Sequence, residues 1–155
     1  MSIDDDIAFF EKVPTLSVLG RPALRILAIG AESRYVHNGE VLFYAGDAAD
    51  GGYVIQEGSF NLRTDDPVDK RGVTVGPGAL LGELALLVRT ERPATATALE
   101  PSTVIRIPRN LFLKMLEGYP DVAQKMRDSL AMRTDDWTHE LRKVKTALET
   151  VGGAR

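Results

Sequence analysis

Hydrophobic residues divide the 155-residue chain into three parts by their spacing. Up to about residue 31, and again over residues 108–151, they recur at the three- and four-residue intervals of an amphipathic helix. Over residues 32–107, short runs rich in Val, Ile, Tyr and Phe are separated by Gly and Pro at close intervals, which is typical of β-strands. The pattern predicts one α+β domain over residues 1–155, with helices at both ends of a β region.

The N-terminal part is expected to hold two helices. Ser2 can cap the first, and three aspartates lie near the positive end of its dipole. Pro14 is expected to end this helix. The second helix should begin near Pro22, because proline is tolerated in a first turn. Its apolar positions follow helical spacing: Leu24, Leu27 and Ala28.

The β region contains seven expected strands, and no long helix separates them. They cover Tyr35–His37, Val41–Phe43, Tyr53–Gln56, Ser59–Arg63, Val73–Val75, Ala94–Leu99 and Val104–Ile107. Many short strands joined by Gly- and Pro-containing turns favour a closed β-roll, a double-stranded β-helix of the jelly-roll kind. Tyr53 and Phe43 have the spacing of β-core residues, so we assign them to packing rather than to ligand contact.

After Pro108 a short helix is expected to end around Gly118–Pro120, followed by a long final helix from about Asp121 to Thr150. Apolar residues of the final helix advance by four, three, four and three, which is heptad spacing: Trp137, Leu141, Val144, Leu148 and Val151. The spacing predicts a homodimer through the C-terminal helix. The alternative is that this helix folds back and covers its own roll.

Candidate chemistry is concentrated in residues 82–95, Gly-Glu-Leu-Ala-Leu-Leu-Val-Arg-Thr-Glu-Arg-Pro-Ala-Thr. A glycine turn opens a short helical segment, and free N–H groups at a helix start can bind an anion. Arg92 can return to the position of Glu83, and arginine is suited to bidentate phosphate recognition. Because the carboxylate would repel a simple anion, the pair indicates a ligand with both a phosphate and a ribose hydroxyl.

This segment resembles the phosphate-binding cassette of cyclic-nucleotide-binding domains, such as those of the bacterial catabolite activator and of protein kinase A regulatory subunits. In that family a Gly-Glu-Leu-Ala-Leu run precedes an Arg-x-Ala-Thr run. Residues 39–43 and 46–58 look like the first strands of the family's β-roll, and the resemblance runs from about Gly39 to Arg109. It implies a β-roll with an internal cassette helix.

The resemblance also implies a role for each matching position. Glu83 would accept the ribose 2′-hydroxyl beside the backbone of Gly82, and Arg92 would pair with the cyclic phosphate, helped by the Ala85 N–H. The other expected ligand-binding residues are Leu84, Pro93, Ala94 and Thr95. A surface ion pair between Glu83 and Arg92, with little energetic value, is the alternative. Trp137 could stack on the purine as a lid, but we favour its place in the heptad seam.

Pro93 departs from the family pattern. The family usually has a small residue after the arginine, whose N–H also reaches the phosphate, whereas proline has no N–H. Losing one charge-assisted hydrogen bond costs about 1.5–3 kcal/mol, or roughly ten- to a hundredfold in affinity. Members that prefer cyclic GMP often carry a threonine hydroxyl here, so its absence favours cyclic AMP over cyclic GMP.

The overall composition narrows the class of protein. Nineteen basic and twenty-two acidic side chains give a net charge of −3, without the basic excess that non-specific nucleic-acid binding needs. No helix-turn-helix follows the long helix, so we expect no direct DNA binding. The chain has no cysteine, an acidic start unlike a signal peptide, and no apolar run near the ~20 residues of a membrane span. We expect a cytoplasmic protein without membrane contact.

A jelly-roll can also be a cupin enzyme, whose metal needs two or three clustered histidines with a carboxylate. The two histidines, His37 and His139, fall in an early strand and in the final helix, so no metal site is expected. The sequence predicts a non-enzymatic sensor that binds a cyclic nucleotide and acts on an unknown effector protein through its C-terminal helices. The alternative is a degenerate fold that serves as a ligand-free dimerisation or interaction module.

Overall fold

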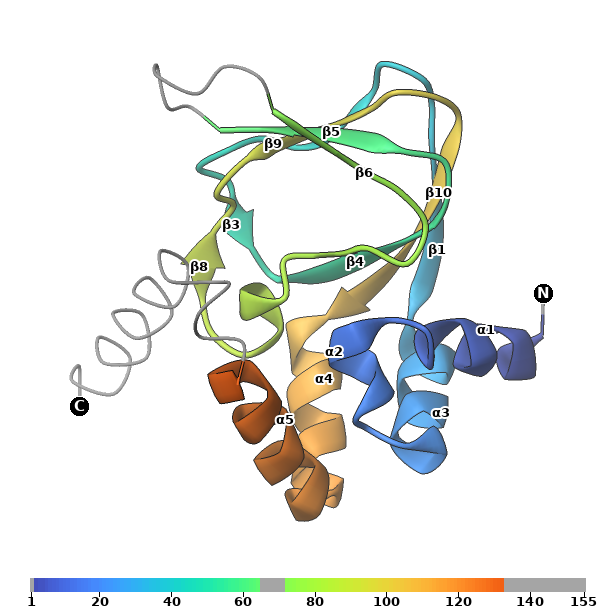
Figure 1. Ribbon diagram of the computed structural model, residues 1–155, viewed down its shortest axis with the longest axis vertical. Coiled ribbons are helices and arrows are strands. Elements are labelled where there is room, and N and C mark those ends of the chain that lie inside the picture. The colour runs from blue at the N-terminus through green and yellow to red at the C-terminus, as the bar shows by residue number, and fades with distance from the viewer. Residues whose placement is uncertain (1, 65–71, 133–155) are drawn as a thin grey trace.

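Two four-stranded antiparallel sheets form the walls of a roll in the computed structural model, which describes residues 2–64 and 72–132 (Figure 1). The first sheet has the order β1 (Glu32–Val36), β10 (Ser102–Pro108), β4 (Gly51–Glu57) and β7 (Leu80–Leu81). The second has the order β2 (Val41–Phe43), β9 (Thr95–Ala98), β5 (Phe60–Arg63) and β6 (Val73–Val75). A two-stranded ribbon of β3 (Ala48–Ala49) and β8 (Thr90–Glu91) lies beside them.

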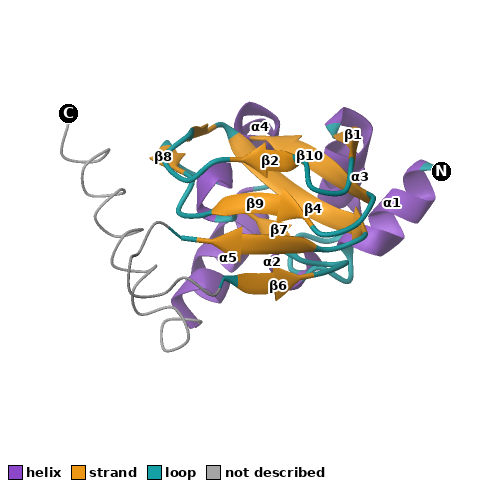
Figure 2. Cartoon of the chain, turned by 90° about the horizontal axis from the view of Figure 1, so that it is seen from above, coloured by secondary structure: helices purple, strands orange, loops and turns teal. Residues whose placement is uncertain are grey.

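Helices cover the face of the first sheet that points away from the roll, as Figures 1 and 2 show. They are α1 (Ile3–Phe10), α2 (Pro14–Ser17), α3 (Arg21–Gly30), α4 (Arg109–Gly118) and α5 (Pro120–Met132). Successive side chains along the strands of the first sheet point alternately into two cores, one under the helices and one inside the roll. Val54 and Ile105 pack against the helices, whereas Tyr53, Ile55 and Val104 point into the roll toward Phe60 of the second sheet.

Most expected elements are confirmed, and the α+β β-roll is the observed fold. Ser2 caps α1 in a capping box, accepting from the Asp5 N–H at 3.1 Å. The prediction for Pro14 was wrong: α1 ends at Phe10, and Pro14 is the first residue of α2. Proline is suited to that position because the N–H it lacks has no partner inside a helix.

The expected final helix begins one residue earlier than predicted, at Pro120, and is described as far as Met132. The residues of the predicted seam, with the candidate lid Trp137, lie outside the described residues. The ribbon and β7 were missed, because strands of two residues are too short to show a period of two.

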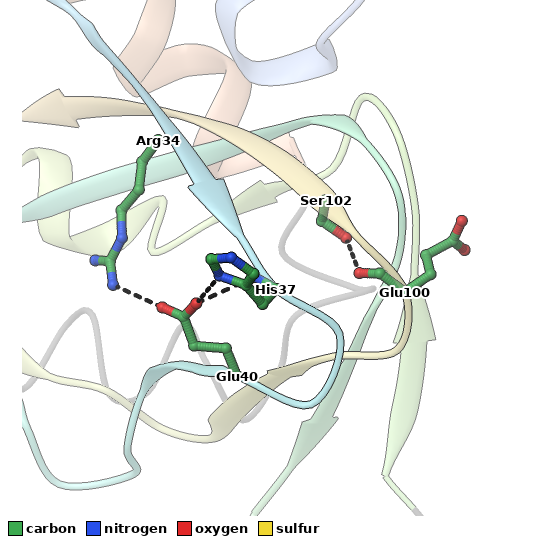
Figure 3. Close-up of polar contacts among 5 residues, drawn as sticks. All are labelled: Arg34, His37, Glu40, Glu100 and Ser102. Atoms are coloured by element: carbon green, nitrogen blue, oxygen red, sulfur yellow. Dashed lines mark hydrogen bonds and ion pairs between the residues drawn. The ribbon is translucent and has the colours of Figure 1, made fainter.

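The turn between β1 and β2 is held by Glu40, whose carboxylate accepts from the His37 N–H at 3.1 Å (Figure 3). The same carboxylate contacts His37 Nδ1 at 3.1 Å and accepts from Arg34 Nη2 at 3.3 Å. Ser102 and Glu100 form a second contact in Figure 3, in which the Ser102 hydroxyl donates to the Glu100 carbonyl at 2.8 Å. The exposed contacts of Glu40 and the partly buried contact of Ser102 fix the turns at one end of the roll.

Candidate functional site

Arg92 follows β8, and its backbone is fixed to the turn between β2 and β3. Its N–H donates to the Asp47 carbonyl at 2.8 Å, and its carbonyl accepts from the Gly46 N–H at 2.8 Å. Three residues later, the Thr95 hydroxyl accepts from the Ala45 N–H at 2.9 Å. These bonds join two segments about 45 residues apart in sequence, so the direction in which the Arg92 side chain leaves the backbone is set by the roll itself.

The Arg92 side chain points into the protein rather than into solvent. The residue is 4% exposed, and Nη1 has no hydrogen-bond partner among the described residues. The guanidinium carbon lies 4.4 Å from the centre of the Phe43 ring and 5.4 Å from that of Tyr53. Because Arg92 is buried, the alternative of a solvent-exposed surface pair does not describe this residue.

Burial lowers the pKa of Arg92 below its ordinary value, and this effect outweighs Tyr53, Asp50 and Asp47, which act in the opposite direction. An arginine stays protonated in proteins even so. The direction of the shift shows that the surroundings under-stabilise its positive charge. An anion in contact with the guanidinium would act in the same direction as Asp50 and Asp47, which raise the pKa of Arg92.

Gly82 brings the start of the cassette against this guanidinium. Its φ of +85° is in the left-handed region that favours glycine. A Cβ at this position would overlap Arg92 Nη1 and lie 3.0 Å from the Gly51 carbonyl oxygen. Glycine is thus required both by the backbone and by the close approach of Arg92. Arg92 returns to the start of the cassette at Gly82, and its predicted meeting with Glu83 stays a prediction.

The short helical segment expected after the glycine turn is present. It is one 3₁₀ turn, Leu84–Leu86, with Glu83 as its half-buried N-cap residue in helical conformation. The Ala85 N–H donates to the Gly82 carbonyl at 3.0 Å. A phosphate could use this N–H only by sharing it with the Gly82 carbonyl or by breaking that hydrogen bond.

The remaining predicted residues line the same segment. Leu84 is half-buried, Ala94 is buried, and Pro93 is exposed directly after the buried arginine. Thr95 is half-buried and uses its hydroxyl to hold the Ala45 backbone. Their roles toward a ligand stay predictions.

Arg109, the first residue of α4, was not predicted as part of this region. Its Nη1 donates to the carbonyls of Ala49, Ala85 and Val88 at 2.8, 3.2 and 3.2 Å. One side chain therefore joins β3 and the cassette helix to the start of α4. Its sequence signal is weak, because an arginine after a strand is equally typical of a solvated helix start.

Phe43 and Tyr53 pack in the core of the roll, as predicted, but they also contact the candidate site. Alternating spacing places both rings inward without showing which charged group they meet. Among residues 2–64 and 72–132, no three His, Cys, Asp or Glu side chains lie together as a metal site. Exposed His37 pairs with Glu40, and His139 lies outside the described ranges.

Residues 33–119 match the cyclic nucleotide-binding domain family, and this stretch covers the roll, the cassette and α4. The chain belongs to that family. Domains of this family are regulatory modules, and the family relationship implies a cyclic nucleotide as the class of ligand. Within the described part of the domain, no helix is long and apolar enough to cross a membrane.

Curated relatives of the domain are larger proteins. The lysophospholipase nte1 of Neosartorya fischeri is 29% identical over 122 residues, which are 77% of this chain and 8% of that protein. The cAMP-dependent protein kinase type II regulatory subunit of Drosophila melanogaster is 32% identical over 133 residues, 85% of this chain and 34% of that protein. The chain thus spans about a third or less of these relatives.

One similar solved structure is matched over almost its whole length. The cyclic nucleotide-binding-like protein of Brucella abortus is 38% identical, with a TM-score of 0.65. The match covers 74% of this chain and 99% of that one.

Proposed function

We propose that this domain senses cyclic AMP without catalysing a reaction, and that its phosphate-binding residue is Arg92. The buried Nη1 of Arg92 carries the proposal, because it has no partner among the described residues. A buried donor left without a partner costs about 1–3 kcal/mol, more when it is charged. A phosphate oxygen beside Gly82 would remove that cost and neutralise the charge.

The other cassette residues complete the proposed ligand contacts. Glu83 adjoins Gly82 at the start of the 3₁₀ turn and would accept the ribose 2′-hydroxyl. Cyclic AMP is proposed over cyclic GMP because Pro93 stands where a threonine hydroxyl would bind guanine. The absent N–H of Pro93 predicts a modest affinity.

Isothermal titration of the purified chain with cyclic AMP, cyclic GMP and 5′-AMP tests the proposal. We expect cyclic AMP to bind most tightly, and at a hundred times its Kd to stabilise the fold by about 2.7 kcal/mol. Arg92→Ala should abolish binding. Arg89→Ala is the matched control, because Arg89 is an exposed arginine three residues away. No heat of binding and no melting shift at millimolar cyclic AMP would favour the ligand-free module instead.

The proposed output is a change in the C-terminal helices of a cytoplasmic homodimer that acts on an effector protein. Arg109 supports a link to the helices, since it joins the cassette carbonyls to the first residue of α4. The dimer rests on the apolar spacing of residues 137–151 alone. Sedimentation at several concentrations, with Leu141→Asp as the probe, tests it, and a monomer unchanged by that substitution would contradict it.

A further inference from the structure

Two aromatic rings, one from each sheet, meet the guanidinium of Arg92. Phe43 ends β2 of the second sheet, and Tyr53 lies in β4 of the first. Their ring centres are 6.0 Å apart with 29° between the ring planes. The guanidinium carbon is 4.4 Å from the first centre and 5.4 Å from the second. Both distances are inside the ~6 Å range of cation–π attraction.

A guanidinium presents two different surfaces to its neighbours. Aromatic rings stack on its flat faces, whereas its N–H donors lie in the plane and point outward from the edge. A guanidinium that lies flat on the rings of Phe43 and Tyr53 would keep its in-plane donors available. One of these, Nη1, lies against Gly82 and has no partner among the described residues.

We infer that Phe43 and Tyr53 are positioning residues, which hold the flat guanidinium of Arg92 so that its Nη1 edge faces the start of the cassette. The inference rests on the proposed binding of a cyclic phosphate to Arg92. A free arginine side chain samples many rotamers, and each rotamer bond fixed before binding lowers the entropic cost of capturing the ligand. The rings fix the arginine in advance and also keep water from its faces.

Phe43 is a better position than Tyr53 for testing this arrangement by substitution. It is half-buried at the edge of the roll core, so its replacement disturbs packing less than a change at Tyr53, which is 8% exposed. Its ring is also the closer of the two to Arg92. A leucine or methionine at position 43 would keep an apolar side chain of similar size but would remove the ring face.

The test compares Phe43→Leu and Phe43→Met with Phe43→Tyr, which keeps the ring. Titration with cyclic AMP should show about tenfold weaker binding for the first two and near-native binding for the third. In the ligand-free protein, the Arg92 Nε–H resonance should be displaced by the ring current of Phe43. It should move toward the position of an exposed arginine in both aliphatic variants. Melting curves supply the control: a purely structural role of Phe43 would lower the melting temperature of the aliphatic variants and leave the Kd of the folded protein for cyclic AMP unchanged.

The outcomes separate this inference from the proposed function. If the unchanged chain binds cyclic AMP and the aliphatic variants bind it equally well, the inference is overturned and the function stands. If the unchanged chain binds no cyclic nucleotide, the proposed function fails and the inference fails with it. An unshifted Arg92 resonance in the unchanged chain would overturn the inference even if neither aliphatic variant folds.

Discussion

Arg34 and Arg92 show two ways in which the same side chain is accommodated in this fold. The Arg34 side chain is 44% exposed and donates to Glu40, which also accepts from the His37 N–H (Figure 3). Arg92 is 4% exposed, lies on two aromatic rings, and has one terminal nitrogen without a partner among the described residues. The first cluster is completed by its own chain, whereas the second has an open position.

The difference matters because water is available to only one of the two clusters. An exposed donor can hydrogen-bond to solvent at little cost, so an unpaired donor on Arg34 would not indicate a ligand. A buried donor cannot do so, and native proteins leave few of them unsatisfied. The open position at Arg92 is therefore the stronger indication of a ligand.

Arg106 is a second arginine whose pKa can be compared with that of Arg92. Burial also acts against its charge, but the hydrogen bond from Arg106 Nη2 to Asp50 at 2.7 Å and the charge of Asp50 raise the pKa of Arg106. The charge of Asp50 also acts on Arg92, where burial outweighs it and lowers the pKa. The charges of Asp50 and Asp47 therefore do not offset the effect of burial on the pKa of Arg92.

After Arg92→Ala, the largest effect is expected for Gly82→Ala, which we compare with Gly39→Ala beside Glu40. Both glycines have positive φ, +85° and +84°, so each variant should lose about 1–3 kcal/mol through backbone strain. A Cβ at Gly39 meets nothing within 4 Å, whereas one at Gly82 overlaps Arg92 Nη1. Gly82→Ala should therefore also weaken cyclic AMP binding by about tenfold or more, and Gly39→Ala should not.

Melting curves and titrations of the two variants measure both effects. Equal affinities for cyclic AMP would show that Arg92 need not touch the start of the cassette, and would remove Gly82 from the site.

The sequence predicts the helices and strands of this domain better than the side-chain contacts in its candidate site. The strands β2 and β6 were predicted with their observed bounds, because short runs of β-branched and aromatic residues are bounded by glycine or proline there. The start of α3 at Arg21–Pro22 was predicted for a local reason as well, the preference of proline for a first turn.

The features of the site that were missed depend on tertiary contacts. Stacking of Phe43 on Arg92 joins residues 49 positions apart, and no local pattern encodes it. The resemblance implied that the Ala85 N–H helps to bind the phosphate, and the tight 3₁₀ turn directs this N–H to the Gly82 carbonyl. Cassette spacing predicted which residues gather, whereas the fold determines how their donors are used.

A smaller effect on cyclic AMP binding is expected at Pro93, which follows Arg92. Pro93 is exposed next to a buried arginine and cannot donate a hydrogen bond. Pro93→Ala would restore an N–H beside the phosphate and should tighten cyclic AMP binding by about tenfold. Pro101→Ala is the control, because Pro101 is also exposed but lies outside the cassette. Unchanged or weaker binding in titrations of Pro93→Ala would mean that the proline belongs to a working site.

The smallest effect, on the stability of the fold, is expected at Glu40, which accepts hydrogen bonds from Arg34 and His37. The pKa of Glu40 is lowered below its ordinary value of 4.5, first by the His37 N–H and then by the His37 ring and Arg34. A carboxyl with a lowered folded-state pKa stabilises the fold above its unfolded-state pKa. That stabilisation is lost as pH falls through the lower folded-state value. Glu40→Gln should therefore have a slightly lower melting temperature than the unchanged chain at pH 7, and this difference should disappear on acidification below about pH 4.

Exposed Glu117→Gln on α4 is the control for the Glu40→Gln variant. Cyclic AMP affinity should stay the same in Glu40→Gln, because this cluster is complete without a ligand. A gap that persists at low pH would show that the carboxylate charge of Glu40 is not what holds the turn.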